Sequence, residues 1–267
     1  MPSVLRVAIA LACVVLLRPI VASAEDNVLI PDQRVVAGQT GVWVPVTVTN
    51  SAALQGFQIL ARYDSNVLTF TRHTLDYTVT SVLEPEFLQV NNRQTHLEVG
   101  CLFDFVPPLD NRTLGPHQGG RILHFVFDVA KDVAPGTETE ISLVNDPTLS
   151  QVRNIFTVSG RSISPTLQGA TLTVAPPEEG EILFLRGDVD GNSSYNLVDV
   201  LFVLNYLFLN GTRPVCLDAA DFEDTGRVNL TSVLALVNYI FQGGPPPPLP
   251  FPVPGLDPSA DRLPGCG

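Results

Sequence analysis

The sequence is poor in basic residues. Lys and Arg together number 15 against 27 acidic residues, and Lys131 is the only lysine. The formal net charge of −12 would repel a phosphate backbone, so we expect no nucleic acid partner. Methionine and tryptophan occur once each in 267 residues. Apolar residues make up 45% and charged residues 16%, a balance that indicates a globular chain and excludes a disordered one.

Long apolar runs are absent except near the N-terminus, so we expect no membrane span in the mature chain. Residues 1–24 have the features of a secretory signal peptide: Arg6, then an apolar run over residues 7–17, then small residues before Glu25. A retained anchor is the alternative interpretation. We therefore predict a secreted, extracellular protein.

Cysteine is scarce as well, and three cysteines remain once residues 1–24 are removed. Cys101 shares one face of an alternating segment with four apolar residues, which predicts a buried thiol. Cys216 and Cys266 are then left as partners in an oxidising compartment, where their disulfide would close a loop of about 50 residues.

Between residues 27 and 175 apolar side chains recur at every second position, the period of half-buried strands. Val42, Val44, Val46 and Val48 are one example. Further strands are expected at residues 57–63, 67–71, 97–105, 123–129, 140–144 and 170–174. Many short strands without intervening helices predict a mainly β domain, a sandwich of the jelly-roll kind.

After an expected linker at residues 176–182 the period becomes helical. One apolar stripe contains Val200, Val203, Leu204, Leu207 and Phe208, and a second contains Val233, Leu236, Val237, Ile240 and Phe241. The two stripes are 33 residues apart, and at the same offset of 33 residues Asp221 repeats Asp188 and Asn229 repeats Asn196. Residues 183–245 thus predict a small α domain of two loop–helix repeats, followed by a proline-rich tail at 246–267.

The loop of the first repeat has oxygen-bearing residues at the positions that bind Ca²⁺ in twelve-residue calcium loops. The expected ligands are Asp188, Asp190, Asn192, the Ser194 carbonyl, Asn196 and Asp199. Position 8 of this loop is Tyr195, which we expect to face Val228 of the second repeat. Position 6 is Ser193 where the sharp turn normally has glycine, which would weaken binding.

The loop of the second repeat is a poorer cation site. Its corresponding residues are Asp221, Glu223, Thr225, the Arg227 carbonyl, Asn229 and Ser232. It retains Gly226 for the turn, but it has fewer charged ligands and Ser232 cannot bind a cation bidentately. Calcium is therefore expected in the first loop more than in the second.

The repeated segments Gly187–Asn192, Asn196–Asp199 and Asp218–Asp221 make residues 183–245 resemble a type I dockerin, a module of two EF-hand-like calcium loop–helix units. This resemblance implies calcium-dependent docking onto a cohesin-type sandwich, often in polysaccharide-related assemblies. It also implies that loop positions 10 and 11 and the exposed helix face contact the partner. Those positions are Leu197, Val198, Leu230 and Thr231.

The N-terminal region resembles the first part of a cohesin domain. The segments that carry this resemblance are Val35–Gln39, Leu54–Ile59 and Tyr63–Leu68. Related carbohydrate-binding sandwiches have a similar N-terminal sequence. The main hypothesis is therefore a non-catalytic assembly protein. One alternative is a carbohydrate-binding module tethered by the dockerin, with Trp43 as a sugar platform and polysaccharide as a partner.

A small polysaccharide hydrolase is the least supported alternative, because no catalytic motif is present. The carboxylates that a hydrolase could use are Glu84, Glu86, Glu98, Asp104 and Asp128, each of which also fits a solvated face. His96 and His124 are expected to point outward from strands, where a metal site is a remote alternative. We predict that the protein is not an enzyme.

Overall fold

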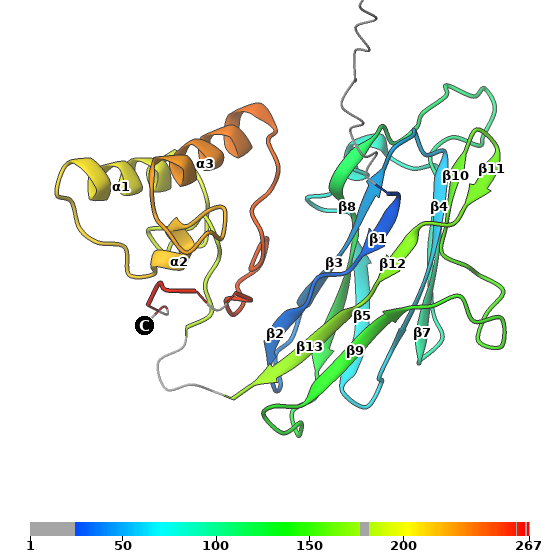
Figure 1. Ribbon diagram of the computed structural model, residues 1–267, viewed down its shortest axis with the longest axis horizontal. Coiled ribbons are helices and arrows are strands. Elements are labelled where there is room, and N and C mark those ends of the chain that lie inside the picture. Colours follow the sequence, from blue (N-terminus) through cyan, green and yellow to red (C-terminus); the bar gives the residue numbers. More distant parts are fainter. Residues whose placement is uncertain (1–24, 177–181, 260, 265, 267) are drawn as a thin grey trace, which may run out of the picture.

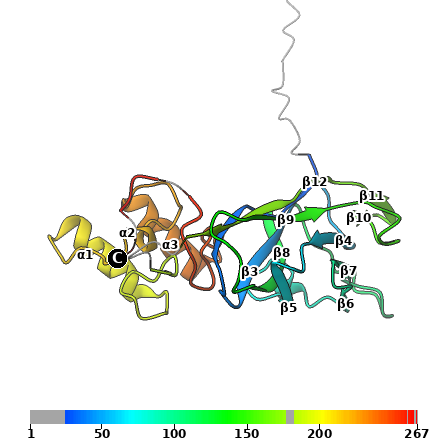
Figure 2. The ribbon, with the colours of Figure 1, turned by 90° about the horizontal axis from the view of Figure 1, so that it is seen from below.

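The computed structural model describes residues 25–176, 182–259, 261–264 and 266. The predicted signal peptide and most of the predicted linker lie outside these residues. The chain forms a β-sandwich followed by a smaller helical module, which lies to one side of the sandwich in both views (Figures 1 and 2). No helix among the described residues is long and apolar enough to cross a bilayer.

Two sheets make the sandwich. The five-stranded sheet contains, in order, β12 (Thr166–Gln168), β1 (Asn27–Leu29), β3 (Val42–Asn50), β8 (His117–Val129) and β5 (Leu68–Thr74). The second sheet contains β11 (Arg161–Ile163), β10 (Ile155–Val158), β4 (Gly56–Tyr63), β9 (Glu138–Leu143), β13 (Ala170–Ala175) and β2 (Gln33–Val36), with β7 (His96–Leu102) between β4 and β6 (Phe87–Asn92). The predicted sandwich is confirmed.

The alternating residues of the long strands meet between the two sheets. Phe125 and Phe127 of β8 are fully buried, and Phe127 packs edge-to-face against Tyr63 of β4. Cys101 of β7 lies in the same core as a free, buried thiol, as predicted. Burial raises the pKa of this thiol to about 12, so it stays protonated at neutral pH.

His96 and His124, which were expected to point outward from their strands, are nevertheless buried, at 6% and 0% exposure. His124 lies beneath Trp43, with 5.0 Å between the ring centres. On the same face, Phe251 from the C-terminal tail packs against Tyr77. The tail thus covers a face that the local alternation marks as solvated. Neither histidine belongs to any group of metal-ligating side chains in the described residues.

The helical module contains α1 (Leu197–Phe208), the short α2 (Leu217–Ala220) and α3 (Leu230–Gln242); a 3₁₀ turn, η1 (Ser81–Leu83), lies in the sandwich. Helices α1 and α3 begin at the repeated asparagines, whose side-chain oxygens accept hydrogen bonds from Val198 N and Thr231 N. Val200 and Val203 of α1 share a small core with Val233 and Leu236 of α3. The two repeats are therefore packed together as one unit.

Candidate metal centre and docking face

Three carboxylates converge at the first loop. Asp188 and Asp190 come from the loop and Asp199 from the first turn of α1, and each offers an oxygen within 4.8 Å of the others. Carboxylate oxygens are the ligands that hard divalent cations prefer. The donor set therefore fits calcium, and a cation here would be held by these three side chains.

Backbone N–H groups hold the carboxylates of this loop in place. Asp188 accepts hydrogen bonds from Asn192 N at 2.9 Å and Ser193 N at 2.8 Å. Asp199 accepts from Val189 N at 2.7 Å and also from Asp190 N and Asn196 N. These bonds wrap the chain around the acidic group, so the loop backbone already has a compact turn.

The carboxylates also repel one another. Burial raises the pKa of Asp199 above its usual range, and the charge of Asp190 adds to this effect, against the hydrogen bonds that favour the ionised form. A bound cation would offset both the desolvation cost of the buried Asp199 carboxylate and its repulsion by Asp190.

The other expected ligands of the first loop are engaged locally. Asn192 accepts a hydrogen bond from Ser194 N through its side-chain oxygen and donates its amide to Asp190. Asn196 uses its side-chain oxygen to cap α1. The ring of Tyr195, which was expected to face Val228, lies against Tyr239 and Phe251, at 5.7 and 5.1 Å between ring centres.

The second loop has the same backbone form with different chemistry. Asp221 accepts from Thr225 N at 2.8 Å and Gly226 N at 2.6 Å, as Asp188 does in the first loop. Position 6 is left-handed in both loops, with φ 66° at Ser193 and 72° at Gly226.

Hydroxyl groups in this second loop replace the amide of Asn192, at Thr225, and the carboxylate of Asp199, at Ser232. The Thr225 hydroxyl donates to Asp221, and the Ser232 hydroxyl donates to the Arg227 carbonyl. Glu223 is exposed. No trio of converging acids includes Asp221 or Glu223 among the described residues. The shape of the loop is thus maintained by hydrogen bonds, and calcium in either loop stays a prediction.

The residues expected to contact a partner lie on an exposed apolar face of the helix pair. On α1 this face contains Leu197, Val198, Leu201 and Phe208, and on α3 it contains Leu230, Thr231, Leu234 and Phe241. We call these two matching sets the twin stripes. Phe208 and Phe241, the last residues of the two apolar stripes of the sequence, are 62% and 61% exposed. They lie in the last turns, beyond the helix–helix contact.

Cys216 and Cys266 form a disulfide that joins the start of α2 to the end of the described tail. The loop that it closes spans 50 residues of sequence separation and contains α3 and the tail.

No family model matches the chain, and no curated protein matches it. Several solved structures share its sandwich.

These structures are cohesin structures, similar at low identity. A chain of a type I cohesin–dockerin complex from Clostridium thermocellum is 17% identical, with 56% of this chain and 99% of that chain covered and a TM-score of 0.46. The seventh ScaB type I cohesin of Pseudobacteroides cellulosolvens is 18% identical (58% and 96% covered, TM-score 0.46). A non-cellulosomal cohesin of Archaeoglobus fulgidus is 15% identical (58% and 94% covered, TM-score 0.43). At these values the likeness says nothing of partner or activity.

Two of the carboxylates considered for hydrolysis, Glu86 and Glu98, are engaged in structural roles. Glu86 accepts hydrogen bonds from Phe105 N and Val106 N, which hold its pKa below the usual range. Glu98 accepts from the Ser150 hydroxyl, and its pKa is lowered for that reason first. A glycosidase acid needs the opposite shift. Trp43, the candidate sugar platform, is only 9% exposed and packs against Tyr77 and His124.

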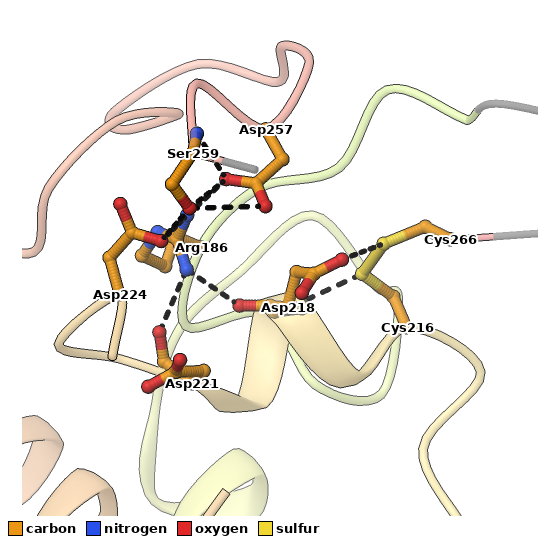
Figure 3. The surroundings of a disulfide bond; sticks show 9 residues. Arg186, Cys216, Asp218, Asp221, Asp224, Asp257, Ser259 and Cys266 are labelled. Carbon is orange, nitrogen blue, oxygen red and sulfur yellow. Dashed lines mark hydrogen bonds and ion pairs between the residues drawn. A yellow bond between two sulfur atoms is a disulfide. The ribbon is translucent and has the colours of Figure 1, made fainter. Parts of the chain in front are cut away.

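Sequence reasoning missed Arg186, which is fully buried between the module and its tail. Its guanidinium forms ion pairs with Asp224 at 3.1 Å and Asp257 at 3.0 Å (Figure 3). The available signal was an arginine placed directly between an apolar run, residues 182–185, and an acidic loop. Its partners are too distant in sequence for any local period to reveal them.

Proposed function

We propose that the protein is an exported, non-catalytic assembly protein whose helix pair docks onto a cohesin-type β-sandwich in a calcium-dependent way. The observation that supports this most directly is the exposure of the twin stripes. Large apolar side chains at matching positions of both helices remain in solvent, and contiguous exposed apolar surface is typical of interaction sites.

The class of partner follows from the resemblance of residues 183–245 to type I dockerins. Leu201 and Leu234 occupy the same place in the two repeats, at 55% and 59% exposure, and their helices are packed on a shared core. A flat partner surface such as the face of a sheet can contact both stripes together. Calcium enters because Asn196, the ligand expected at position 9, caps α1, and Asp199, the ligand expected at position 12, lies in its first turn.

The test is a binding measurement by biolayer interferometry on the immobilised full chain. The analytes are a panel of cohesin-type sandwiches and a second copy of this chain, each with calcium and with chelator. We expect at least one sandwich to bind in calcium and to dissociate in chelator. The double variant Leu201→Asp, Leu234→Asp should weaken that binding by about 100-fold or more, since buried apolar anchors carry most of the binding energy of an interface.

Val215→Asp is the matched control, because Val215 is 82% exposed in the same module but lies outside the twin stripes. It should bind like the wild type. Equal binding by the double variant and the wild type would contradict the proposal, and so would a panel in which no sandwich binds.

A further inference from the structure

A second acidic group lies where the C-terminal tail meets the short helix α2, beside the disulfide (Figure 3). It consists of Asp218 from α2 and of Asp257 and Asp261 from the tail. Each offers a carboxylate oxygen within 4.8 Å of the others. None of the three belongs to the ligand positions of either calcium loop.

Asp218 distinguishes this group from an ordinary acidic surface. Its side chain is 3% exposed, and its Oδ1 atom is buried without a hydrogen-bond partner among the residues that the structure describes. Its Oδ2 atom lies 3.7 Å from Cys266 Sγ, which is bonded to Cys216 and therefore has no proton to donate. A buried carboxylate without donors is costly, so a positive partner is expected at this position.

Arg186 cannot be that partner, although it lies beside the group. Its guanidinium has five N–H donors. They meet five oxygens: the carbonyls of Leu249, Asp218 and Asp221 and the carboxylates of Asp224 and Asp257. All donors of Arg186 are thus engaged elsewhere, and its hydrogen bond to Asp218 goes to the backbone carbonyl and not to the carboxylate.

The charges of the group are also unbalanced. Burial first, and then the charges of Asp257 and Asp261, raise the pKa of Asp218 to about 6. Burial likewise raises the pKa of Asp257, against the charge of Arg186. The single charge of Arg186 therefore does not compensate the carboxylates around it, and a divalent ion would.

We propose that Asp218, Asp257 and Asp261 bind a hard divalent cation of the calcium class, which ties the C-terminal tail to α2. Three carboxylate oxygens are a suitable core for such an ion. Asp261 is exposed and gives access from solvent, so water can complete the coordination shell. The ion and the adjacent disulfide would hold the same two segments together, and the site is independent of the docking proposed above.

The test counts the calcium ions bound by the full chain in equilibrium dialysis, up to about 1 mM free calcium, the weak end of the range of extracellular sites. The main variant is Asp261→Asn, because this side chain is exposed and an asparagine can keep the hydrogen bond that its Oδ1 accepts from Leu263 N. Asp190→Asn removes a first-loop ligand, and Asp132→Asn, an exposed acid of the sandwich, is the control.

We expect Asp261→Asn to bind one calcium fewer than the wild type, and the double variant Asp190→Asn, Asp261→Asn to bind fewer than either single variant. Asp218→Asn should repeat the loss. Calcium should also slow amide hydrogen exchange of residues 255–264 in Asp190→Asn but not in Asp261→Asn.

A count in Asp261→Asn equal to that of the wild type and of Asp132→Asn would overturn the proposal. Failure of docking in the binding measurement above leaves this count unaffected, so the two proposals fail separately.

Discussion

The sandwich and the helical module are stabilised in different ways. In the sandwich, both sheets bury aliphatic and aromatic side chains in one continuous core. In the module, the core between α1 and α3 is small, and much of the remaining interior consists of a disulfide, a buried arginine and converging carboxylates. The stability of the sandwich should therefore depend little on metal and redox conditions, whereas that of the module should depend on both.

The largest effect is expected from Arg186→Met. The substitution leaves the carboxylates of Asp224 and Asp257 without their buried partner, a change that typically costs about 3–5 kcal/mol. Amide hydrogen exchange resolved by segment should show faster exchange in α1 and α3 and unchanged exchange in β3 and β8. Arg213→Met, at an exposed arginine of the same module, should change neither. Loss of protection in the sandwich as well would show that the two parts unfold together.

Removal of the disulfide comes next. The bond closes a loop with a sequence separation of 50, which predicts a stabilisation of about 4 kcal/mol in the chain-entropy model. Cys216→Ser with Cys266→Ser should lower the protection of α3 by up to that amount. Because Cys101 is a buried free thiol, Cys101→Ser is the matched control, and any cost should appear in the sandwich alone. Equal protection of α3 with and without the bond would contradict this expectation.

The sandwich should in turn have a pH dependence of its own. Burial, and then the charge of Arg121, lower the pKa of His124 to about 3, against the charge of Asp76. Between pH 6.5 and 3 the unfolded chain binds a proton that the folded chain does not, so stability falls as the pH falls through this window. From pH 6.5 to 5 the loss is about 2 kcal/mol.

Urea unfolding followed by the fluorescence of Trp43, the single tryptophan, measures this loss in the sandwich. His124→Phe keeps a ring at the site and removes the titration. The variant should lose about 2 kcal/mol less than the wild type over the same pH interval. Identical pH dependence in the two proteins would show that His124 is not the group responsible.

The smallest effect concerns the turn of the first loop. Ser193 has φ 66°, a conformation that costs a non-glycine residue about 1 kcal/mol. Ser193→Gly should therefore raise the calcium affinity of the first loop by about fivefold in a calorimetric titration. Gly226→Ser makes the reverse change in the second loop, where it should destabilise the turn. An unchanged or lower affinity in Ser193→Gly would contradict the prediction.

Much of the fold could be predicted because it follows local periods. Alternation in Val42–Val48 identified β3, and the 33-residue offset of the repeat identified α1 and α3. Helix α2 was missed, since four residues are too few for a period.

The errors concern contacts between distant segments. Trp43 and His124 are buried because Tyr77 and the tail around Phe251 cover their sheet, and no local pattern contains that information. Arg186 was missed for the same reason, since its partner Asp257 lies 71 residues away. The acidic residues of the first loop were found because ligand spacing along a single loop is itself a local pattern.

The central claim is that the carboxylates of the first loop bind calcium, and isothermal titration calorimetry of the full chain tests it most directly. Asp190→Asn and Glu223→Gln change the same position in the first and second loops. We predict that calcium binds the wild type, that Asp190→Asn loses one binding event, and that Glu223→Gln retains it. Absence of binding at millimolar calcium, or identical titrations for Asp190→Asn and the wild type, would contradict the account.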